Sequence, residues 1–413
     1  MPDCQPPAVG TAGMRFASYA GKCRQETDMR DRLPGHGLGL PVVMPYRPDA
    51  CAAASHEIAT HQRIAQKVAQ LLGRRLQDPP EDLVQWRAAY GAAGGSPYYV
   101  PFDTLEVAVA TALGIHGVPD LFGGVVPQAF VATKVITHPV WSPDAAAPAG
   151  WCRTMGGLIE DVVLPGYSAF AVADARRAGR LLLREGRGRV KAPMDKGGLG
   201  QQVIRDAHAL DACLVPLEDT LATTGVVLER DMDHVRTCSV GQIILDGVCL
   251  SYHGTQCLTP DNTGGMVYGG SSLQVVRGDF DAVLRLPLDP QTRRAVVQAC
   301  RYHQTAQECY PGLYASRCNY DVLQGETAGG VWQSGVLEQS WRVGGATGAE
   351  LAAFAYLREH PEVGQVRAVT CEIYGRAAAS TPVPRDAVIY FDGDDGSVGP
   401  LLKYARVETD AGP

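Results

Sequence analysis

The sequence has no long run of apolar residues. Nowhere in its 413 residues is there an uninterrupted apolar stretch of about 18, the length that a helix needs to cross a bilayer. The first 34 residues mix proline, glycine and charged residues, without the apolar segment of a secretory signal. We therefore expect a cytoplasmic protein that has no membrane partner.

Positive charge and cysteine pairs are also scarce. The formal net charge is −7, whereas proteins that bind nucleic acid nonspecifically carry a basic patch and a high pI. The 12 cysteines are scattered and include no CxxC pair, which favours reduced thiols over a disulfide framework or a zinc site. The sequence therefore predicts a protein without a nucleic-acid partner. It does not indicate the oligomeric state, and a homo-oligomer is compatible with it.

The chain is too long for one simple core, and strand and helix patterns alternate along it. We expect a chain of mixed α/β and α+β class, with a mostly antiparallel C-terminal half. The predicted order is a disordered tail (1–38), a small N-terminal α/β domain (39–128), a linker (129–165), a central lobe (166–235), a C-terminal lobe (236–400) and a tail (401–413).

A phosphate-binding pattern begins at Lys191, which ends a short predicted strand and is followed by the turn residue Pro193. A lysine at a strand end can meet a phosphate as a point charge, although a solvated surface lysine is the alternative. The glycines Gly197, Gly198 and Gly200 follow, and backbone without Cβ atoms can approach phosphate oxygens closely. An ordinary hairpin turn is the alternative there.

Three later acidic residues extend this pattern. Glu229 follows three apolar residues, as at the exit of a buried strand, where it would contact an adenine amino group or a ribose. A surface glutamate at a strand end is the alternative. Asp321 and Glu338 lie on two predicted strands joined by a glycine-rich turn, so antiparallel pairing would bring their carboxylates together as Mg²⁺ ligands. Arg342 would neutralise a transferring phosphoryl group or a substrate carboxylate.

In the order of these pieces, the stretch from Pro165 to Gly345 resembles the ATP-grasp superfamily. The resemblance implies ATP and Mg²⁺ held between two α+β lobes, with Lys134 and Lys191 on the nucleotide, Glu229 at the adenine and the glycine loop closing over the phosphates. It further implies Asp321, Glu338 and Ser340 as metal ligands and Arg342 as a catalytic residue. Ser340 stands where the family usually has asparagine, and a second acidic residue after Glu229 is missing.

Within the superfamily, the chain resembles a bacterial group with no assigned function. The segments that carry this resemblance are Ser251–Gln256 and Tyr268–Ser271, and the sequence gives neither a physical role.

The resemblance implies a carboxylate–amine ligase that acts through an acyl-phosphate, with a small-molecule or peptide-like carboxylate and an amine acceptor as substrates. Two alternatives remain open. One is a kinase that phosphorylates a hydroxyl of a small molecule. The other is a nucleotide-binding regulatory protein whose catalysis is weakened, which the serine at 340 favours.

Overall fold

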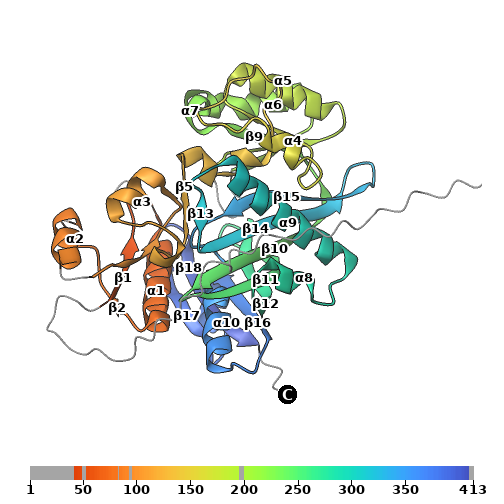
Figure 1. Cartoon of the computed structure of the whole chain (residues 1–413). Helices are drawn as coiled ribbons and strands as arrows, with labels where there is room; N and C mark the ends of the chain where they lie inside the picture. Colours follow the sequence, from red (N-terminus) through yellow and green to blue (C-terminus); the bar gives the residue numbers. More distant parts are fainter. Residues whose placement is uncertain (1–40, 49–52, 82, 93–94, 195–199, 409–413) are drawn as a thin grey trace, which may run out of the picture. The chain divides into compact units, whose positions relative to one another are not determined.

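The computed structural model describes residues 41–48, 53–81, 83–92, 95–194 and 200–408, and their strands form four sheets (Figure 1). The predicted tail 1–38 lies outside these residues.

The N-terminal region contains two small sheets, and its main sheet is parallel, with strand order β2-β1-β3. Its two longer strands, β1 and β3, are near-continuous apolar runs, as expected where both faces are covered. The elements of this region are β1 (Val42–Tyr46), α1 (Ser55–Leu72), β2 (Arg75–Leu76), α2 (Leu83–Ala92), β3 (Tyr98–Pro101), β4 (Leu105–Glu106), α3 (Val107–Leu113), η2 (Val118–Asp120) and β5 (Gly124–Val126). The second sheet has the order β13-β5-β4 and takes its β13 (Tyr314–Ala315) from much later in the chain.

The central lobe is an antiparallel sheet of order β6-β9-β7-β8, with helices packed on one face. Its strands are β6 (Gly166–Ala169), β7 (Gly188–Lys191), β8 (Gln201–Ile204) and β9 (Val226–Arg230), and its helices are α5 (Val172–Leu183), α6 (Ala207–Leu214), η5 (Val215–Leu217) and α7 (Glu218–Thr224). Alternate residues of the strands, such as Val190 and Leu228, join α5 and α6 in one apolar core. The opposite face carries the side chains of Lys191 and Glu229 next to the buried Val227.

The C-terminal lobe is an eight-stranded antiparallel sheet of order β15-β14-β10-β11-β12-β16-β18-β17. The strands are β10 (Asp233–Leu245), β11 (Val248–Pro260), β12 (Met266–Arg277), β14 (Arg317–Glu326), β15 (Trp332–Ser340), β16 (Gln365–Tyr374), β17 (Val388–Asp395) and β18 (Gly399–Glu408). The helices are α8 (Phe280–Leu284), α9 (Pro290–Cys309), α10 (Thr347–Glu359) and α11 (Arg376–Ser380).

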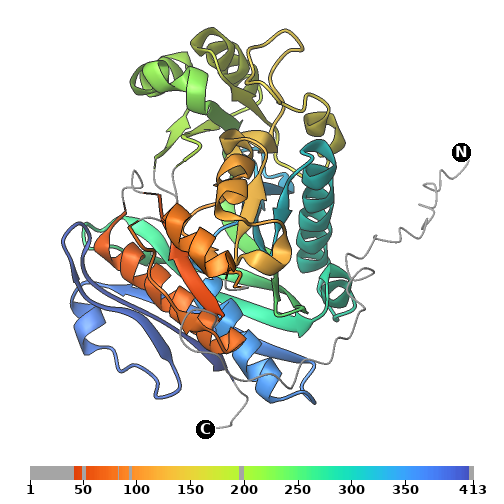
Figure 2. The same cartoon turned by 60° about the vertical axis from the view of Figure 1, so that its left-hand side comes forward.

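The two faces of this large sheet have different covers. Tyr320 and Val240 pack with α9 in one core, whereas Tyr252 and Leu273 pack with α1 and α10 in another. Figure 2 shows α1 and α10 next to each other over the sheet. Because successive side chains of a strand point to opposite faces, Asp321, which follows Tyr320, lies on the face that α1 and α10 cover in part.

Two predicted segments are in fact packed. Residues 129–165, expected to be a linker, include η3 (Ala129–Ala132), η4 (Lys134–Thr137) and α4 (Met155–Leu158), and their apolar side chains are buried in the α9 core. Residues 401–408, expected to be a tail, belong to β18, between β16 and β17. Proline, glycine and alanine are frequent in 129–165, and this composition hides how many of its Val, Ile and Phe side chains are core residues. The remaining domain limits stay predictions.

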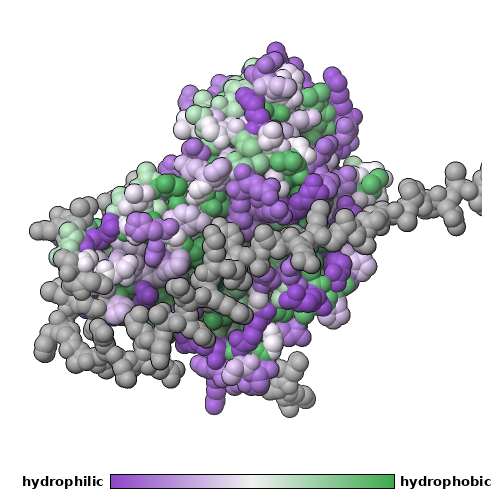
Figure 3. Space-filling view, in the orientation of Figure 1, coloured by the Kyte–Doolittle hydropathy of each residue, from purple (hydrophilic) through white to green (hydrophobic). Residues whose placement is uncertain are grey.

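Among the described residues, no helix combines the length and the apolarity that crossing a bilayer requires. On the face in Figure 3, hydrophilic and hydrophobic residues are interspersed over the lobe at the top, which contains α5, α6 and α7.

Candidate functional site

The central lobe presents an ion pair on its polar sheet face. The register places Lys191 opposite Val227, so Lys191 and Glu229, two residues further along β9, lie on the same face. The ammonium of Lys191 pairs with Oε1 of Glu229, and both side chains are almost fully buried. Glu229 is therefore neither a surface residue nor free at the strand exit, because its carboxylate holds the lysine at the end of the neighbouring strand.

A histidine completes this arrangement, which we call the buried cluster (Lys191, Glu229 and His138). His138 follows η4, and its Nε2 lies 3.2 Å from Oε2 of Glu229, while no described residue bonds to its buried Nδ1. Gly166 makes room for the ring, since a Cβ atom at that position would come within 2.8 Å of Cε1 of His138.

The charge of Glu229 follows from these contacts. Burial alone would raise the pKa of this carboxyl, but the ammonium of Lys191 and the ring of His138 outweigh it and lower the pKa to about 2. Glu229 is therefore ionised at neutral pH despite its complete burial. Its negative charge balances that of Lys191.

A second group, the carboxylate cluster (Asp321, Glu338 and Lys134), lies on the C-terminal sheet. The structure pairs β14 with β15 and puts Asp321 directly opposite Glu338, the strand pairing that the sequence predicts. The ladder is irregular immediately after Asp321. Lys134, from η4, pairs with Oε2 of Glu338 at 2.6 Å.

Asp321 is fixed by three neighbours that donate to the same oxygen. Its Oδ1 accepts from Nε2 of Gln256 at 2.7 Å, from Nδ2 of Asn319 at 2.8 Å and, more weakly, from the hydroxyl of Ser239 at 3.5 Å. Burial and the charge of Glu338 raise the pKa of Asp321 to about 6, although the Asn319 and Gln256 bonds oppose the rise. The two carboxylates therefore repel each other in the absence of a cation.

The segment that starts at η4 joins the two clusters. Lys134 and His138 are four residues apart, and they contact Glu338 of the C-terminal lobe and Glu229 of the central lobe. Between them, the hydroxyl of Thr137 lies 3.1 Å from that of the buried Tyr302. The predicted nucleotide residues of the two lobes are thereby brought to one segment.

The last two predicted residues are engaged with other side chains. The hydroxyl of Ser340 accepts from Nη1 of Arg317 at 3.1 Å. The guanidinium of Arg342 lies 3.5 Å from Oδ1 of Asp103, and its Nη1 donates to the carbonyl of Val343. Neither side chain contacts Asp321 or Glu338 through a hydrogen bond or ion pair within the described part of the chain.

The predicted glycine loop is described only at its end. Gly197 and Gly198 lie outside the described residues, while Gly200 is exposed and has φ of +64°, in the left-handed region that favours glycine. Gln201, which follows Gly200, is paired with Lys191 of the buried cluster on β7 and β8.

Sequence reasoning missed several residues that shape the site. It assigned no role to His138, Asn319 or Arg317. It did single out Ser251–Gln256, and the structure gives that segment a role, since Gln256 donates to Asp321 and Tyr252 to Asn319. In the described ranges, no group of three or more His, Cys, Asp or Glu side chains is arranged to hold a metal ion.

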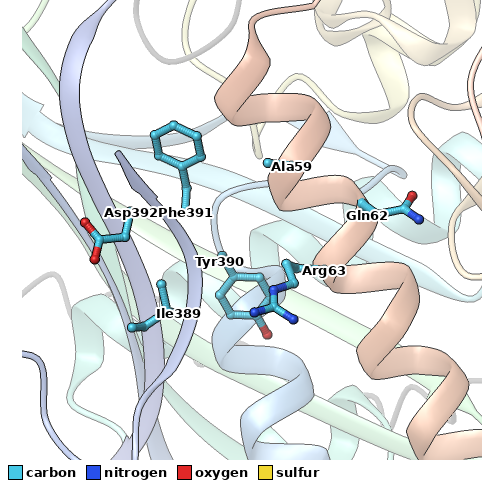
Figure 4. Close-up of a pocket in the computed structure, with 7 residues that line it drawn as sticks. All are labelled: Ala59, Gln62, Arg63, Ile389, Tyr390, Phe391 and Asp392. Carbon is cyan, nitrogen blue, oxygen red and sulfur yellow. The ribbon is translucent and has the colours of Figure 1, made fainter. Parts of the chain in front are cut away.

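A surface hollow of about 450 Å³ lies between α1 and β17, and none of the predicted site residues lines it. In Figure 4, Arg63 of α1 and Tyr390 of β17 lie between the two elements, while Asp392 points away from the helix. The residues that line the hollow are Ala59, Gln62, Arg63, Ile389, Tyr390, Phe391 and Asp392.

Comparison with protein families gives one match over most of the chain. A family model described as "Protein of unknown function (DUF3182)" matches residues 45–405. No match was found among curated proteins.

Solved structures similar to this chain share its fold at low sequence identity. One is N5-carboxyaminoimidazole synthetase from Staphylococcus aureus, with 12% identity and a TM-score of 0.51 over 90% of this chain and 94% of that chain. Another is biotin carboxylase from Campylobacter jejuni, solved as a βγ-ATP complex, with 12% identity and a TM-score of 0.50 over 89% and 87% of the two chains. These structures confirm the predicted ATP-grasp fold, and at such identity they show the fold alone.

Proposed function

The chain belongs to the family described as DUF3182 and has the ATP-grasp fold, and from this premise and the site geometry we propose that it is an ATP- and Mg²⁺-dependent ligase. The reaction would join a carboxylate to an amine or a similar nucleophile.

The observation that carries the proposal is the pairing of Asp321 with Glu338 on adjacent strands. The cluster contains two carboxylates and one ammonium, so its formal charge is −1 when all three groups are ionised. Burial and, after it, the charge of Glu338 raise the pKa of Asp321, and a divalent cation would offset the surplus negative charge. Carboxylate oxygens are the ligands that Mg²⁺ prefers next to substrate phosphates. Asp321 and Glu338 would therefore hold the ion, and Ser340 would add a hydroxyl oxygen.

The two lysines would bind the phosphates. Each is already paired with a carboxylate, Lys191 with Glu229 and Lys134 with Glu338, and both are nearly fully buried. Lys134 would pass from Glu338 to a phosphate oxygen when the metal ion occupies the carboxylate. Lys191 would stay near Glu229, and the loop that includes Gly197, Gly198 and Gly200 would lie over the phosphates.

Transfer of the terminal phosphoryl group of ATP to the substrate carboxylate, with ADP as the leaving group, would depend on positioning and charge. The amine would then displace phosphate from the acyl-phosphate. ATP supplies the phosphoryl group, and Mg²⁺ supplies positive charge that stabilises its transfer. The protein has to orient the acceptor carboxylate and exclude water. Arg342 would meet that carboxylate, or the acyl-phosphate formed from it, after leaving Asp103, from which it is separated by 3.5 Å.

One observation favours a second candidate, a nucleotide-binding protein with little catalysis. Ser340 is bonded to Arg317 and Arg342 is close to Asp103, so the two residues expected to complete the chemistry have other partners. Such a protein would bind the nucleotide with Mg²⁺ and release no phosphate.

A thermal-shift assay with ATP and ADP, each with and without Mg²⁺, tests binding, and a phosphate-release assay over pools of carboxylates and amines tests chemistry. A ligand that binds the native state raises its melting temperature. We expect stabilisation that depends on Mg²⁺, together with phosphate released alongside ADP in at least one pool. Stabilisation without phosphate release would favour the second candidate, and no stabilisation by any nucleotide would contradict both.

A further inference from the structure

The carboxylate of Asp321 has one oxygen committed to hydrogen bonds. All three donors to this carboxylate, from Gln256, Asn319 and Ser239, reach Oδ1, and within the described part of the chain none donates to Oδ2. This asymmetry fixes the plane of the carboxylate. It leaves Oδ2 as the oxygen for an incoming cation.

Asn319 is oriented in turn by a deeper residue. The hydroxyl of Tyr252 lies 3.0 Å from Oδ1 of Asn319 and 2.6 Å from Oε1 of Glu350. The hydroxyl has one hydrogen for these two acceptors, and the amide of Asn319, whose Oδ1 faces this hydroxyl, donates through Nδ2 to Asp321. Tyr252 and Glu350 are fully buried, so no solvent replaces these bonds.

Glu350 also accepts hydrogen bonds from Arg317, which contacts the end of β15. It binds Nε and Nη2 of Arg317, the latter at 2.8 Å. Nη1 of Arg317 then donates to the carbonyl of Arg342 at 2.7 Å and to the hydroxyl and carbonyl of Ser340 at 3.1 and 3.2 Å. Hydrogen bonds thus connect the buried ion pair to two parts of the site. Glu350 is connected to Asp321 through Tyr252 and Asn319, and Arg317 contacts Ser340 and Arg342 directly.

Stability alone does not explain this ion pair. Arg317 and Glu350 are 1% and 0% exposed, and apolar residues of similar volume often replace such pairs without loss of stability. What apolar residues cannot reproduce is the set of directed hydrogen bonds to Asn319, Ser340 and Arg342. The contacts of the pair therefore favour a positional role.

We propose that Arg317, Glu350, Tyr252 and Asn319 are positioning residues that set the orientation of Asp321 and of the Ser340–Arg342 backbone for metal and phosphate binding. The expected effect on metal binding rests on the proposed function. The orientation of Asp321 depends only on contacts within the chain. Residues that orient metal ligands typically change metal affinity by about 10- to 100-fold when they are replaced.

The first test is Tyr252→Phe, which removes one hydroxyl and keeps the ring. Tyr390→Phe is the matched control, because Tyr390 is also buried on this sheet, close to Glu350, and its hydroxyl has no hydrogen-bond partner in the described residues. Crystal structures of wild type and both variants should show that Asn319 and Asp321 rotate only in Tyr252→Phe. Unchanged side chains in Tyr252→Phe would overturn the inference, whether or not the protein binds any nucleotide.

The second test measures the affinity for Mn²⁺, added without nucleotide, in a titration that is monitored by electron paramagnetic resonance. Tyr252→Phe should bind Mn²⁺ about 10-fold more weakly than wild type, and Tyr390→Phe as tightly as wild type. The double variant Arg317→Met/Glu350→Leu should melt close to wild type and also bind Mn²⁺ about 10-fold more weakly. Unchanged affinity in both test variants would overturn the positional role. A wild type that binds no Mn²⁺ contradicts the proposed function instead, and the crystal structures then decide the orientation by themselves.

Discussion

The two clusters next to η4 each contain a lysine paired with a glutamate, and they differ in charge and burial. The buried cluster pairs one lysine with one carboxylate, and both side chains are at most 4% exposed. The carboxylate cluster sets two carboxylates against one lysine, and Glu338 is 31% exposed. In the buried cluster the charges of Lys191 and Glu229 balance, and both side chains are shielded from solvent. The carboxylate cluster keeps a surplus negative charge that solvent reaches.

This difference indicates which cluster receives a cation. The buried cluster lowers the pKa of its carboxyl, because Lys191 already supplies the positive charge. The carboxylate cluster raises the pKa of Asp321, because Glu338 adds negative charge to a buried site. We therefore propose that Glu229 stays paired with Lys191, and that Asp321 and Glu338 bind the metal ion.

The largest expected effect comes from removing charge from the carboxylate cluster. Asp321→Asn and Glu338→Gln should each lower Mg²⁺-dependent phosphate release by about 100-fold or more, since each removes an anionic metal ligand. Nucleotide binding without metal should persist. Glu326→Gln is the control, because Glu326 is an exposed acid at the end of β14. Equal turnover in all three variants would show that the carboxylate cluster has no role in catalysis.

Substitutions in the buried cluster should instead lower the stability of the protein. Glu229→Gln leaves the buried ammonium of Lys191 without its counter-charge, so the free energy of unfolding in urea should fall by about 3 kcal/mol or more at pH 7. Glu185→Gln breaks an ion pair with Arg230 whose acid is 72% exposed, and it should cost less than about 1 kcal/mol. Equal losses in the two variants would mean that the burial of Glu229 has no energetic consequence.

The pH dependence of stability sharpens the same contrast. The pKa of Glu229 is lowered from 4.5 to about 2, so its contribution is fully present above pH 4.5 and is lost as the pH falls toward 2. The shift corresponds to about 3 kcal/mol. The difference in unfolding free energy between wild type and Glu229→Gln should therefore shrink steadily below pH 4.5. A constant difference between pH 7 and pH 3 would contradict the assignment.

Within the buried cluster, the smaller effect is expected at His138. His138→Gln keeps an N–H donor for Glu229 and loses part of the packing against Gly166, so stability should fall by about 1 kcal/mol. Calorimetric melting of His138→Gln beside Glu229→Gln checks this order. A larger loss in His138→Gln would make the histidine, rather than Lys191, the main partner of Glu229.

Some of this site could be predicted from the sequence because local patterns determine it. The turn between two apolar strands predicts the pairing of β14 with β15, and the structure then places Asp321 opposite Glu338. The short strand that ends at Lys191 is likewise a local pattern. The ATP-grasp fold followed from the order of such pieces, and the solved structures confirm it.

The rest depends on contacts between distant segments. His138 meets Glu229 across 91 positions, and Tyr252 meets Glu350 across 98, and no spacing or periodicity indicates either partner. The segment 129–165 was misjudged for a similar reason. Its composition resembles that of a linker, while its burial depends on α9, which comes much later in the chain.

The most direct test of the account is the anomalous scattering of Mn²⁺ in crystals grown with ADP. We expect one strong peak within coordination distance of oxygens of both Asp321 and Glu338, with Lys134 displaced from Glu338. A bound nucleotide with no peak at this pair of carboxylates, or with the ion held by Glu229, would contradict it.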